Sequence, residues 1–211
     1  IGNGDIPERI TEEYQGDFNE IKNDINKCID AVNALVSDTG LLSEAALEGR
    51  LSTRADSSRH GGDFAKVIEG INKTLDAVID PLGIAAGYIG QIGNGRIPEK
   101  ITDEYKGDFN DIKNSINACI DGLGAIREGN AVMLKMSLND YSEEVEGEYL
   151  GIYKELSSSI NMVAGSVKNV IEIMTHVAGG DLSDLDSLLK VGRRSEKDLL
   201  IPGLILMIQS L

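Results

Sequence analysis

Side chains that commonly carry out chemistry are scarce in this chain, which has only two histidines and two cysteines in 211 residues. His60 and His176 are followed by Gly61 and Val177, whereas a phosphoacceptor histidine is typically followed by an acidic residue. The two cysteines lie 91 positions apart, so they do not form the ligand cluster that a zinc site needs. With so few histidines, the sequence offers no Ser-His-Asp or Cys-His constellation. We therefore predict no catalytic residue, no metal site and no cofactor, and we do not expect an enzyme.

Two glycine motifs resemble functional signatures but fit a structural role better. Gly61-Gly62-Asp63-Phe64 is similar to the signature of diguanylate cyclases, yet Gly-Asp-Phe also occurs at 16–18 and 107–109 within a repeat. Gly2-Asn3-Gly4 and Gly93-Asn94-Gly95 are similar to phosphate-binding loops, but both lack the third glycine and a preceding apolar strand. We interpret the latter two as turns at the end of a helix, where glycine supplies a positive φ.

Composition excludes several kinds of partner. The formal net charge is −15, which argues against nucleic acid as the main partner and disfavours adsorption to anionic lipid. Aromatic residues make up 4% of the chain, too few for an aromatic-lined ligand pocket. The longest apolar run, Leu199 to Ile208, is too short for a membrane helix and is interrupted by Pro202. Because the chain starts without methionine, we expect it to be a segment of a longer protein.

The chain repeats itself. Residues 1–31 and 92–122 are identical at 23 of 31 positions, with an offset of 91. A shorter repeat lies within this one, because each Gly-Asp-Phe, and a related Gly151-Ile152-Tyr153, is followed eight residues after its aromatic by an asparagine. These asparagines are Asn26, Asn72, Asn117 and Asn161. The sequence is therefore built of units of about 45 residues, in which two types of unit alternate.

Apolar residues in each unit follow the three- and four-residue spacing of a coiled coil. The predicted helices run through the repeat boundaries and are roughly 30–40 residues long, or about 45–60 Å. Such a helix cannot bury its own apolar stripe, so we expect partner helices within the chain and in a second copy. Pro81 is expected to kink or restart one helix. The residues predicted on the dimer seam are Phe18, Ile25, Cys28, Phe64, Phe109, Cys119, Tyr153 and Val163.

Glycine-marked segments without helical periodicity separate the helices, at 1–10, 48–60, 92–101, 137–145 and 179–192. A connector of ~12 residues spans roughly 40 Å when extended, whereas an antiparallel helix hairpin needs only about 2–5 residues. The connector length therefore favours parallel helix pairs, with each connector returning along the first helix. The residues expected to turn and pin the connectors are Gly4, Ile6, Gly49, Leu51, Ala55, Gly95, Ile97, Gly180 and Leu182, with Ile10, Ile101, Leu185 and Leu188 as further pins.

These features together resemble the HAMP domain, in which a glycine-x-apolar turn opens a pinned connector that leads to an acidic helix start. The turns are Gly4-Asp5-Ile6, Gly49-Arg50-Leu51, Gly95-Arg96-Ile97 and Gly180-Asp181-Leu182. The acidic helix starts are Glu12-Glu13, Asp103-Glu104 and Ser195-Glu196-Lys197-Asp198. The fourth unit loses the turn signal at Met136-Ser137-Leu138. The tandem units are similar to the poly-HAMP arrays of methyl-accepting chemotaxis proteins.

The resemblance implies an all-α fold, an elongated array of parallel four-helix coiled-coil bundles formed by a homodimer, with helices joined by extended connectors. It divides the chain into a partial unit 1–30, units 31–78 and 79–121, a divergent unit 122–164 and a unit 165–211.

The resemblance also implies a function, the relay of a conformational signal from an upstream sensor to a downstream output module of a chemotaxis transducer. The implied partners are a second copy of the chain and the adjoining domains of the same parent. The segment is expected to be cytoplasmic and not to insert into a membrane itself. Its parent protein can be membrane-anchored. The alternatives are the HAMP array of a sensor histidine kinase and a passive coiled-coil dimerisation stalk.

Overall fold

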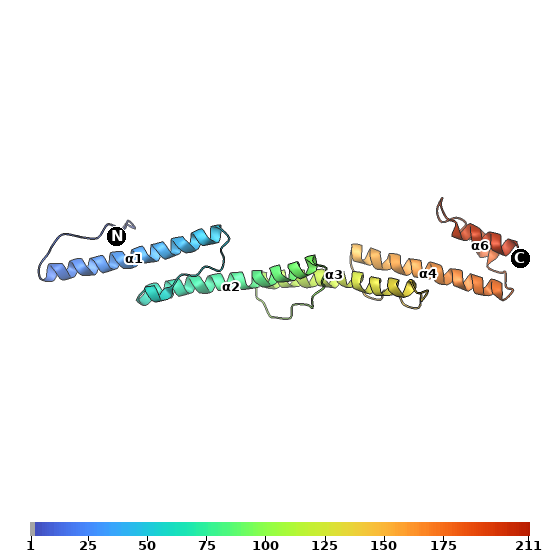
Figure 1. Cartoon of the computed structure of the whole chain (residues 1–211), viewed down its shortest axis with the longest axis horizontal. Helices are drawn as coiled ribbons and strands as arrows, with labels where there is room; N and C mark the ends of the chain where they lie inside the picture. The colour runs from blue at the N-terminus through green and yellow to red at the C-terminus, as the bar shows by residue number, and fades with distance from the viewer. Residues whose placement is uncertain (1–2) are drawn as a thin grey trace. The chain divides into compact units, whose positions relative to one another are not determined.

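Helices account for all the regular secondary structure that is described. The computed structural model describes residues 3–211, with helices α1 Asp17–Leu47, α2 Gly62–Gly93, α3 Asp108–Met136, α4 Ile152–Ala178, α5 Leu185–Val191 and α6 Leu200–Gln209, and a 3-10 turn η1 Ser57–Arg59 (Figure 1). Residues 3–211 contain no strand, which confirms the all-α class. The first two residues of the predicted connector 1–10 and unit 1–30, and with them Gly2 of the predicted turn, lie outside the described residues.

Four helices end in the same hydrogen-bonded turn. At the end of α1, Gly49 has a φ of 76°, and the N–H of Arg50 donates to the carbonyl oxygen of Ala45 at 2.8 Å. The same bond closes the next three long helices, from Arg96 to Gln91, from Asp140 to Lys135 and from Asp181 to His176. It is the six-to-one bond of a Schellman motif, which needs a left-handed residue at its turn. The interpretation of Gly93-Asn94-Gly95 as a helix end is thereby confirmed.

The turn of the fourth connector lies three residues later than the sequence suggested. Asn139 has a φ of 63° and stands where the other connectors have glycine. The turn is therefore Asn139-Asp140-Tyr141 rather than Met136-Ser137-Leu138. Asparagine adopts the left-handed conformation more readily than most residues other than glycine, so the turn is kept although its glycine is not.

A second glycine of positive φ marks the start of each long helix. These glycines are Gly16, Gly62, Gly107 and Gly151, with φ values of 57°, 56°, 54° and 56°. The Gly-Asp-Phe sequences therefore open helices, as expected of a structural motif. The predicted acidic helix starts Glu12-Glu13 and Asp103-Glu104 are wrong, because the connector stays extended until the glycine is reached. The connectors are accordingly longer than predicted, at 48–61, 94–107 and 137–151.

The chain forms two compact units, residues 1–90 and residues 91–211. In the first unit, α1 and the first part of α2 run in the same direction, and the connector between them returns along α1 (Figure 1). The arrangement is the parallel pair that the connector length predicted. Its core joins residues of α1, the connector and α2, namely Leu42, Ala55 and Ile68, with Leu35, Ile71 and Leu75 packed around them.

The second unit holds α3 and α4 side by side and parallel (Figure 1). The ring of Tyr153 lies so close to Gly122 that a Cβ there would overlap it, and a Cβ on Gly129 would lie 2.5 Å from Cδ1 of Ile160. The partners in each contact are 31 positions apart, and the two contacts are seven positions apart. Side chains of α4 therefore fill spaces left by glycines of α3 once per heptad, as knobs fill holes in a coiled coil.

The end of α4 packs against the two short helices that follow it. One cluster of buried residues joins α4, α5 and α6, namely Ile173, Leu188, Ile201, Leu204 and Ile208. Pro202 is the third residue of α6. In the first turn of a helix a backbone N–H has no intrahelical acceptor, so proline removes no helical hydrogen bond there.

The helix does not restart at Pro81, because α2 is continuous from Gly62 to Gly93 with the proline inside it. A proline at this place removes the N–H that would bond to the carbonyl of Ala77, which is one bond in a helix of 32 residues. Long helices accommodate such a loss with a local bend.

The glycine holes of α3 give a direct test of the packing in the second unit. We expect Gly122→Ala to lower the free energy of unfolding by about 1–3 kcal/mol, because the new methyl group overlaps the Tyr153 ring and overpacking outweighs the better helix propensity of alanine. Urea unfolding followed by circular dichroism measures the change. The matched control is Gly165→Ala in α4, where a Cβ would meet no atom within 4 Å. This control should stabilise by up to about 1 kcal/mol, and equal effects of the two variants would contradict the packing.

Candidate functional site

Each of four helices carries an asparagine whose side chain binds the backbone of a connector. The Oδ1 of Asn26 accepts from the N–H of Ile10 at 2.8 Å, and its Nδ2 donates to the carbonyl of the same residue at 2.9 Å. The same two-bond contact joins Asn72 to Ala55, Asn117 to Ile101 and Asn161 to Val145. We call this contact the asparagine clamp. Sequence reasoning found these asparagines as repeat markers, but it assigned them no contact.

The clamped connector residues lie against the helices. Ala55, Ile101 and Val145 are 9%, 6% and 6% exposed. A buried peptide group without a hydrogen-bond partner destabilises the fold. The clamp provides partners for both the N–H and the carbonyl of a connector residue that is shielded from water. The pins predicted at Ala55 and Ile101 are at this point, and Val145 is a pin that the sequence reasoning missed.

Apart from Leu188, the other predicted connector residues are less deeply buried. Ile6, Ile10 and Ile97 are half-buried, whereas Leu51 and Leu182 are exposed at 43% and 39%. The predicted turn residues Gly4, Gly49, Gly95 and Gly180 all have positive φ. Leu185 is half-buried and Leu188 is buried, and both belong to the cluster around α6.

Most residues predicted on the dimer seam are uncovered within one chain. Phe18 and Val163 are 72% and 54% exposed, and Ile25 is 38% exposed. Both cysteines, Cys28 and Cys119, are exposed and free. Phe64, Phe109 and Tyr153 are half-buried, and the Tyr153 ring packs on Gly122 of its own chain.

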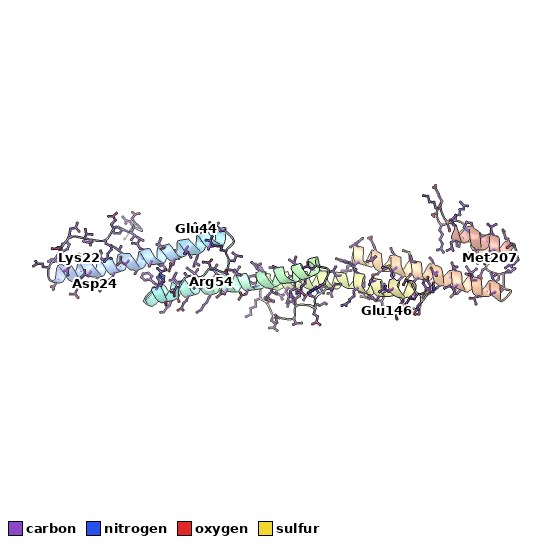
Figure 2. All side chains as sticks on the ribbon, in the orientation of Figure 1. Lys22, Asp24, Glu44, Arg54, Glu146 and Met207 are labelled. Atoms are coloured by element: carbon purple, nitrogen blue, oxygen red, sulfur yellow. The ribbon has the colours of Figure 1, made fainter. Side chains whose placement is uncertain are left out.

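A buried carboxylate of α1 faces the end of the connector 48–61. The Oδ2 of Asp38 lies 2.8 Å from Nε2 of His60, and the two side chains are 9% and 1% exposed. Arg59 Nη1 lies 3.6 Å from the other carboxylate oxygen. On the following helix, Asp76 Oδ1 lies 2.7 Å from Nη2 of Arg54, which is labelled in Figure 2. The connector is therefore held by side chains of both helices of the pair.

A carboxylate of α3 has the corresponding place beside the connector 137–151. One oxygen of Glu128 accepts from the hydroxyl of Tyr149 at 2.7 Å, and the other accepts from the backbone N–H of Glu146 at 2.7 Å. The N–H of Gly147 lies 3.3 Å from each oxygen. The hydrogen bond from Tyr149, followed by that from the Glu146 backbone, lowers the pKa of Glu128. Burial, and then the hydrogen bond to Glu128, raises the pKa of Tyr149.

The two histidines are used for local contacts. His60 is buried against Asp38, as described above. His176 lies in the last turn of α4, half exposed, with Nδ1 2.8 Å from Oδ2 of Asp184. That hydrogen bond and the charge of Asp184 raise the pKa of His176.

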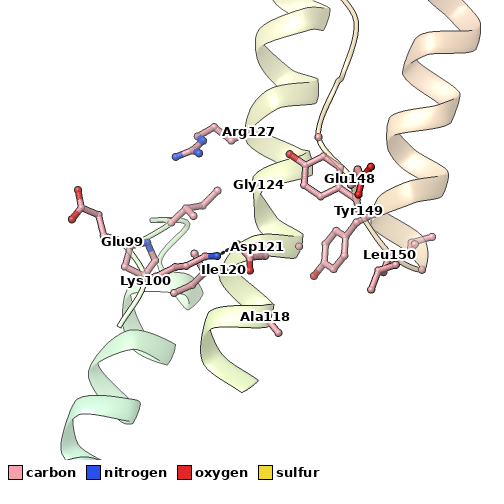
Figure 3. A pocket seen from close by; sticks show the side chains of 17 residues that line it. Glu99, Lys100, Ala118, Ile120, Asp121, Gly124, Arg127, Glu148, Tyr149 and Leu150 are labelled. Carbon is pink, nitrogen blue, oxygen red and sulfur yellow. Dashed lines mark ion pairs between the residues drawn. The ribbon is translucent and has the colours of Figure 1, made fainter. Parts of the chain in front are cut away.

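An open pocket of about 1,060 Å³ lies along α3 between the connectors 94–107 and 137–151 (Figure 3). Lys100 and Asp121 form an ion pair of 2.7 Å on one side of it, and residues 147–153 form the other side. Tyr149 faces Gly124, whose Cβ would lie 3.4 Å from the tyrosine hydroxyl. The pocket is a groove along α3 that the chain leaves unfilled.

Within residues 3–211 no group of three or more histidine, cysteine or acidic side chains is placed to hold a metal ion. In the same part of the chain, no helix is both long and apolar enough to cross a bilayer.

The family model of the HAMP domain matches residues 1–34 and 59–125, just under half of the chain. The matched segments contain the connectors around Ile10 and Ile101, with their clamps, and all of α2. No solved structure matches the chain. The match supports a HAMP domain in these segments and, because HAMP domains relay signals in transducers and kinases, a role in signal transduction.

The asparagine clamp can be tested by truncation. We expect Asn161→Ala to lower the free energy of unfolding by about 1–3 kcal/mol, because it leaves the N–H and carbonyl of the buried Val145 without partners. Asn169→Ala, on an exposed face of the same helix, should change stability by less than about 0.5 kcal/mol. Urea unfolding measures both, and a clamp variant as stable as this control would show that the contact is unimportant.

The lowered pKa of Glu128 predicts a pH dependence with a definite sign. Its pKa lies below 4.5 in the folded chain, so its contribution to stability is present above that pH and is lost as the pH falls through the lower folded value. We therefore expect Glu128→Gln to be less stable than the parent chain at pH 7, and the difference to shrink as the pH falls below 4.5 towards the lower folded pKa of Glu128. Urea unfolding at a series of pH values measures the difference, with Glu148→Gln in the same connector as the control. A difference that does not change with pH would contradict the assignment.

Proposed function

We propose that the chain is a tandem HAMP array that relays conformational signals, as a parallel homodimer, within a chemotaxis transducer. The units proposed are those expected from the sequence, a partial unit 1–30, then 31–78, 79–121, 122–164 and 165–211. The adjoining sensor and output domains of the parent are the other partners. The segment is proposed to act in the cytoplasm without a cofactor.

One observation carries the dimer in this proposal, an uncovered apolar stripe on α3. Ile112, Ile126 and Met133 are 37%, 48% and 47% exposed, and the exposed Cys119 completes the heptad series 112, 119, 126 and 133. A second copy of the same parallel pair, placed about a twofold axis, would cover this stripe with its own. Two helices from each copy make a four-helix bundle, the architecture that the HAMP match supports.

The continuous helices support the relay. α3 is clamped to the connector before it through Asn117 and packs on α4 after it, so it serves two neighbouring units. A bundle relays a signal when two packings differ by a few kcal/mol and an input favours one of them. A helix shared by two bundles passes a change of packing in one to the other.

The dimer is tested by ultracentrifugation and disulfide formation. We expect the chain to sediment at micromolar concentration with twice the mass of one copy. Oxidation should crosslink two copies through Cys119, which lies on the stripe. The control removes both native cysteines and introduces Asn114→Cys, an exposed position on the opposite side of α3. A monomeric mass, or equal crosslinking at both positions, would defeat the proposal.

The activity of the downstream output module distinguishes a relay from a passive stalk. In the parent chain, Ile101→Ala removes a buried connector side chain and should alter the activity of the output module at a temperature where the array is folded. Leu138→Ala changes a connector residue that is 80% exposed and should leave the output unchanged. If Ile101→Ala only lowers the melting temperature, the array is a spacer. If the output module carries a phosphoacceptor histidine, the parent is a sensor kinase rather than a chemotaxis transducer.

A further inference from the structure

The connectors share one position that sequence reasoning did not use. Two residues before the glycine that opens each long helix stand Tyr14, His60, Tyr105 and Tyr149. The connectors 48–61 and 137–151 are the second and fourth along the chain, and we call them the even connectors. In both, this side chain binds a carboxylate of the preceding helix. These are the contacts of His60 with Asp38 and of Tyr149 with Glu128, at 2.8 and 2.7 Å.

The two carboxylates occupy equivalent places. Asp38 lies three residues after Leu35 and four before Leu42, and Glu128 lies three after Ala125 and four before Val132. Leu42 and Val132 are in turn core residues that pack beside the clamped Ala55 and Val145. The two acids therefore sit at the same point of the first helix, on the side that faces the connector.

The odd connectors are 3–16 and 94–107, the first and third along the chain. The sequence before 94–107 offers no carboxylate for this contact. The residues 21 and 22 places before Tyr105, which correspond to the two acids, are Ile84 and Gly83 and carry no acceptor side chain. The charged contacts of the odd connectors run to the following helix, from Arg9 to Asp30 and from Lys100 to Asp121, and the even connectors have such contacts as well.

The seat of Tyr149 is shaped for its ring. A Cβ on Gly147 of the same connector would lie 2.5 Å from the ring, and a Cβ on Gly124 of α3 would lie 3.4 Å from its hydroxyl. The glycines leave room for the ring, the carboxylate accepts its hydroxyl, and the same carboxylate binds the backbone of Glu146. Three donors of the connector, the Tyr149 hydroxyl and the N–H groups of Glu146 and Gly147, thus converge on one acidic side chain of α3.

We propose that Asp38–His60 and Glu128–Tyr149 are one repeated latch, which ties the end of the connector, and with it the start of the second helix, to the first helix of each even pair. The asparagine clamp holds each of the four connectors before α1, α2, α3 and α4 to the helix that follows it, so a latched connector is held at both helices. The sequence before the connector 94–107 carries no acid at this place, so the helices that this connector joins repack more easily. This last step rests on the proposed function, whereas the latch itself does not.

The latch is tested by a double-mutant cycle in the full 211-residue chain. Amide hydrogen exchange, followed by NMR, is measured at Glu146 and Gly147. Glu128→Ala removes the acceptor and should speed exchange about tenfold or more. Tyr149→Phe keeps the ring but removes the hydroxyl and should speed exchange roughly three- to tenfold. In the double variant, the second change should add nothing. Tyr105→Phe, the matched control in an odd connector, should leave both rates within about twofold.

A second cycle tests whether the device is repeated. Asp38→Asn and His60→Gln should be non-additive in urea unfolding, with a coupling of about threefold or more in the unfolding equilibrium constant. Circular dichroism of each variant verifies that the helices are present. Additive effects in either cycle, or a Tyr149→Phe effect that persists in the Glu128→Ala background, would overturn the repeated latch.

Sedimentation of the same samples separates this inference from the proposed function. A monomeric chain with intact coupling would overturn the proposed dimer and leave the latch standing. A dimeric chain without coupling would overturn the latch alone.

Discussion

The structure depends on how an extended connector satisfies its backbone while lying along two helices. Where the connector is pressed closest to them, its peptide groups lose contact with water. One asparagine on each of α1, α2, α3 and α4 then pairs with both polar groups of one connector residue. Because the connector can be held at full length, the second helix can start beside the first and run parallel to it. Parallel pairing in turn leaves the apolar stripe of α3 free for a partner.

The sequence predicts the repeat, the long helices, the parallel pairing and the glycine turns, because each follows from local periodicity or from connector length. Prediction from the sequence fails where one residue type occurs in two different structural positions. Glu12-Glu13 and Asp103-Glu104 suggested helix starts because carboxylates favour that position, but Gly16 and Gly107 set the boundary. The turn at Asn139 is not predicted from the sequence, because asparagine adopts the left-handed conformation less often than glycine does.

The candidate site is predicted less well than the fold. A heptad position shows that a residue faces another helix but not which one. Tyr153, which is predicted on the dimer seam, packs on Gly122 of its own chain. The asparagines were recognised only as markers, because a hydrogen bond to a backbone group 16 positions away leaves no periodic trace. The contact of Glu128 with Tyr149 is hidden for the same reason.

The contacts that define each helix pair all join residues that are close together in the sequence. Among residues 3–211 no side-chain hydrogen bond or ion pair joins positions more than 28 apart, and the widest is that of Arg194 with Ser166. Each segment therefore folds through contacts between its own residues. The loss of chain entropy on forming any one of these contacts is small. An array of this kind lengthens by duplication without acquiring new long-range contacts. A destabilising substitution in one segment affects the neighbouring segments only through the helix that they share.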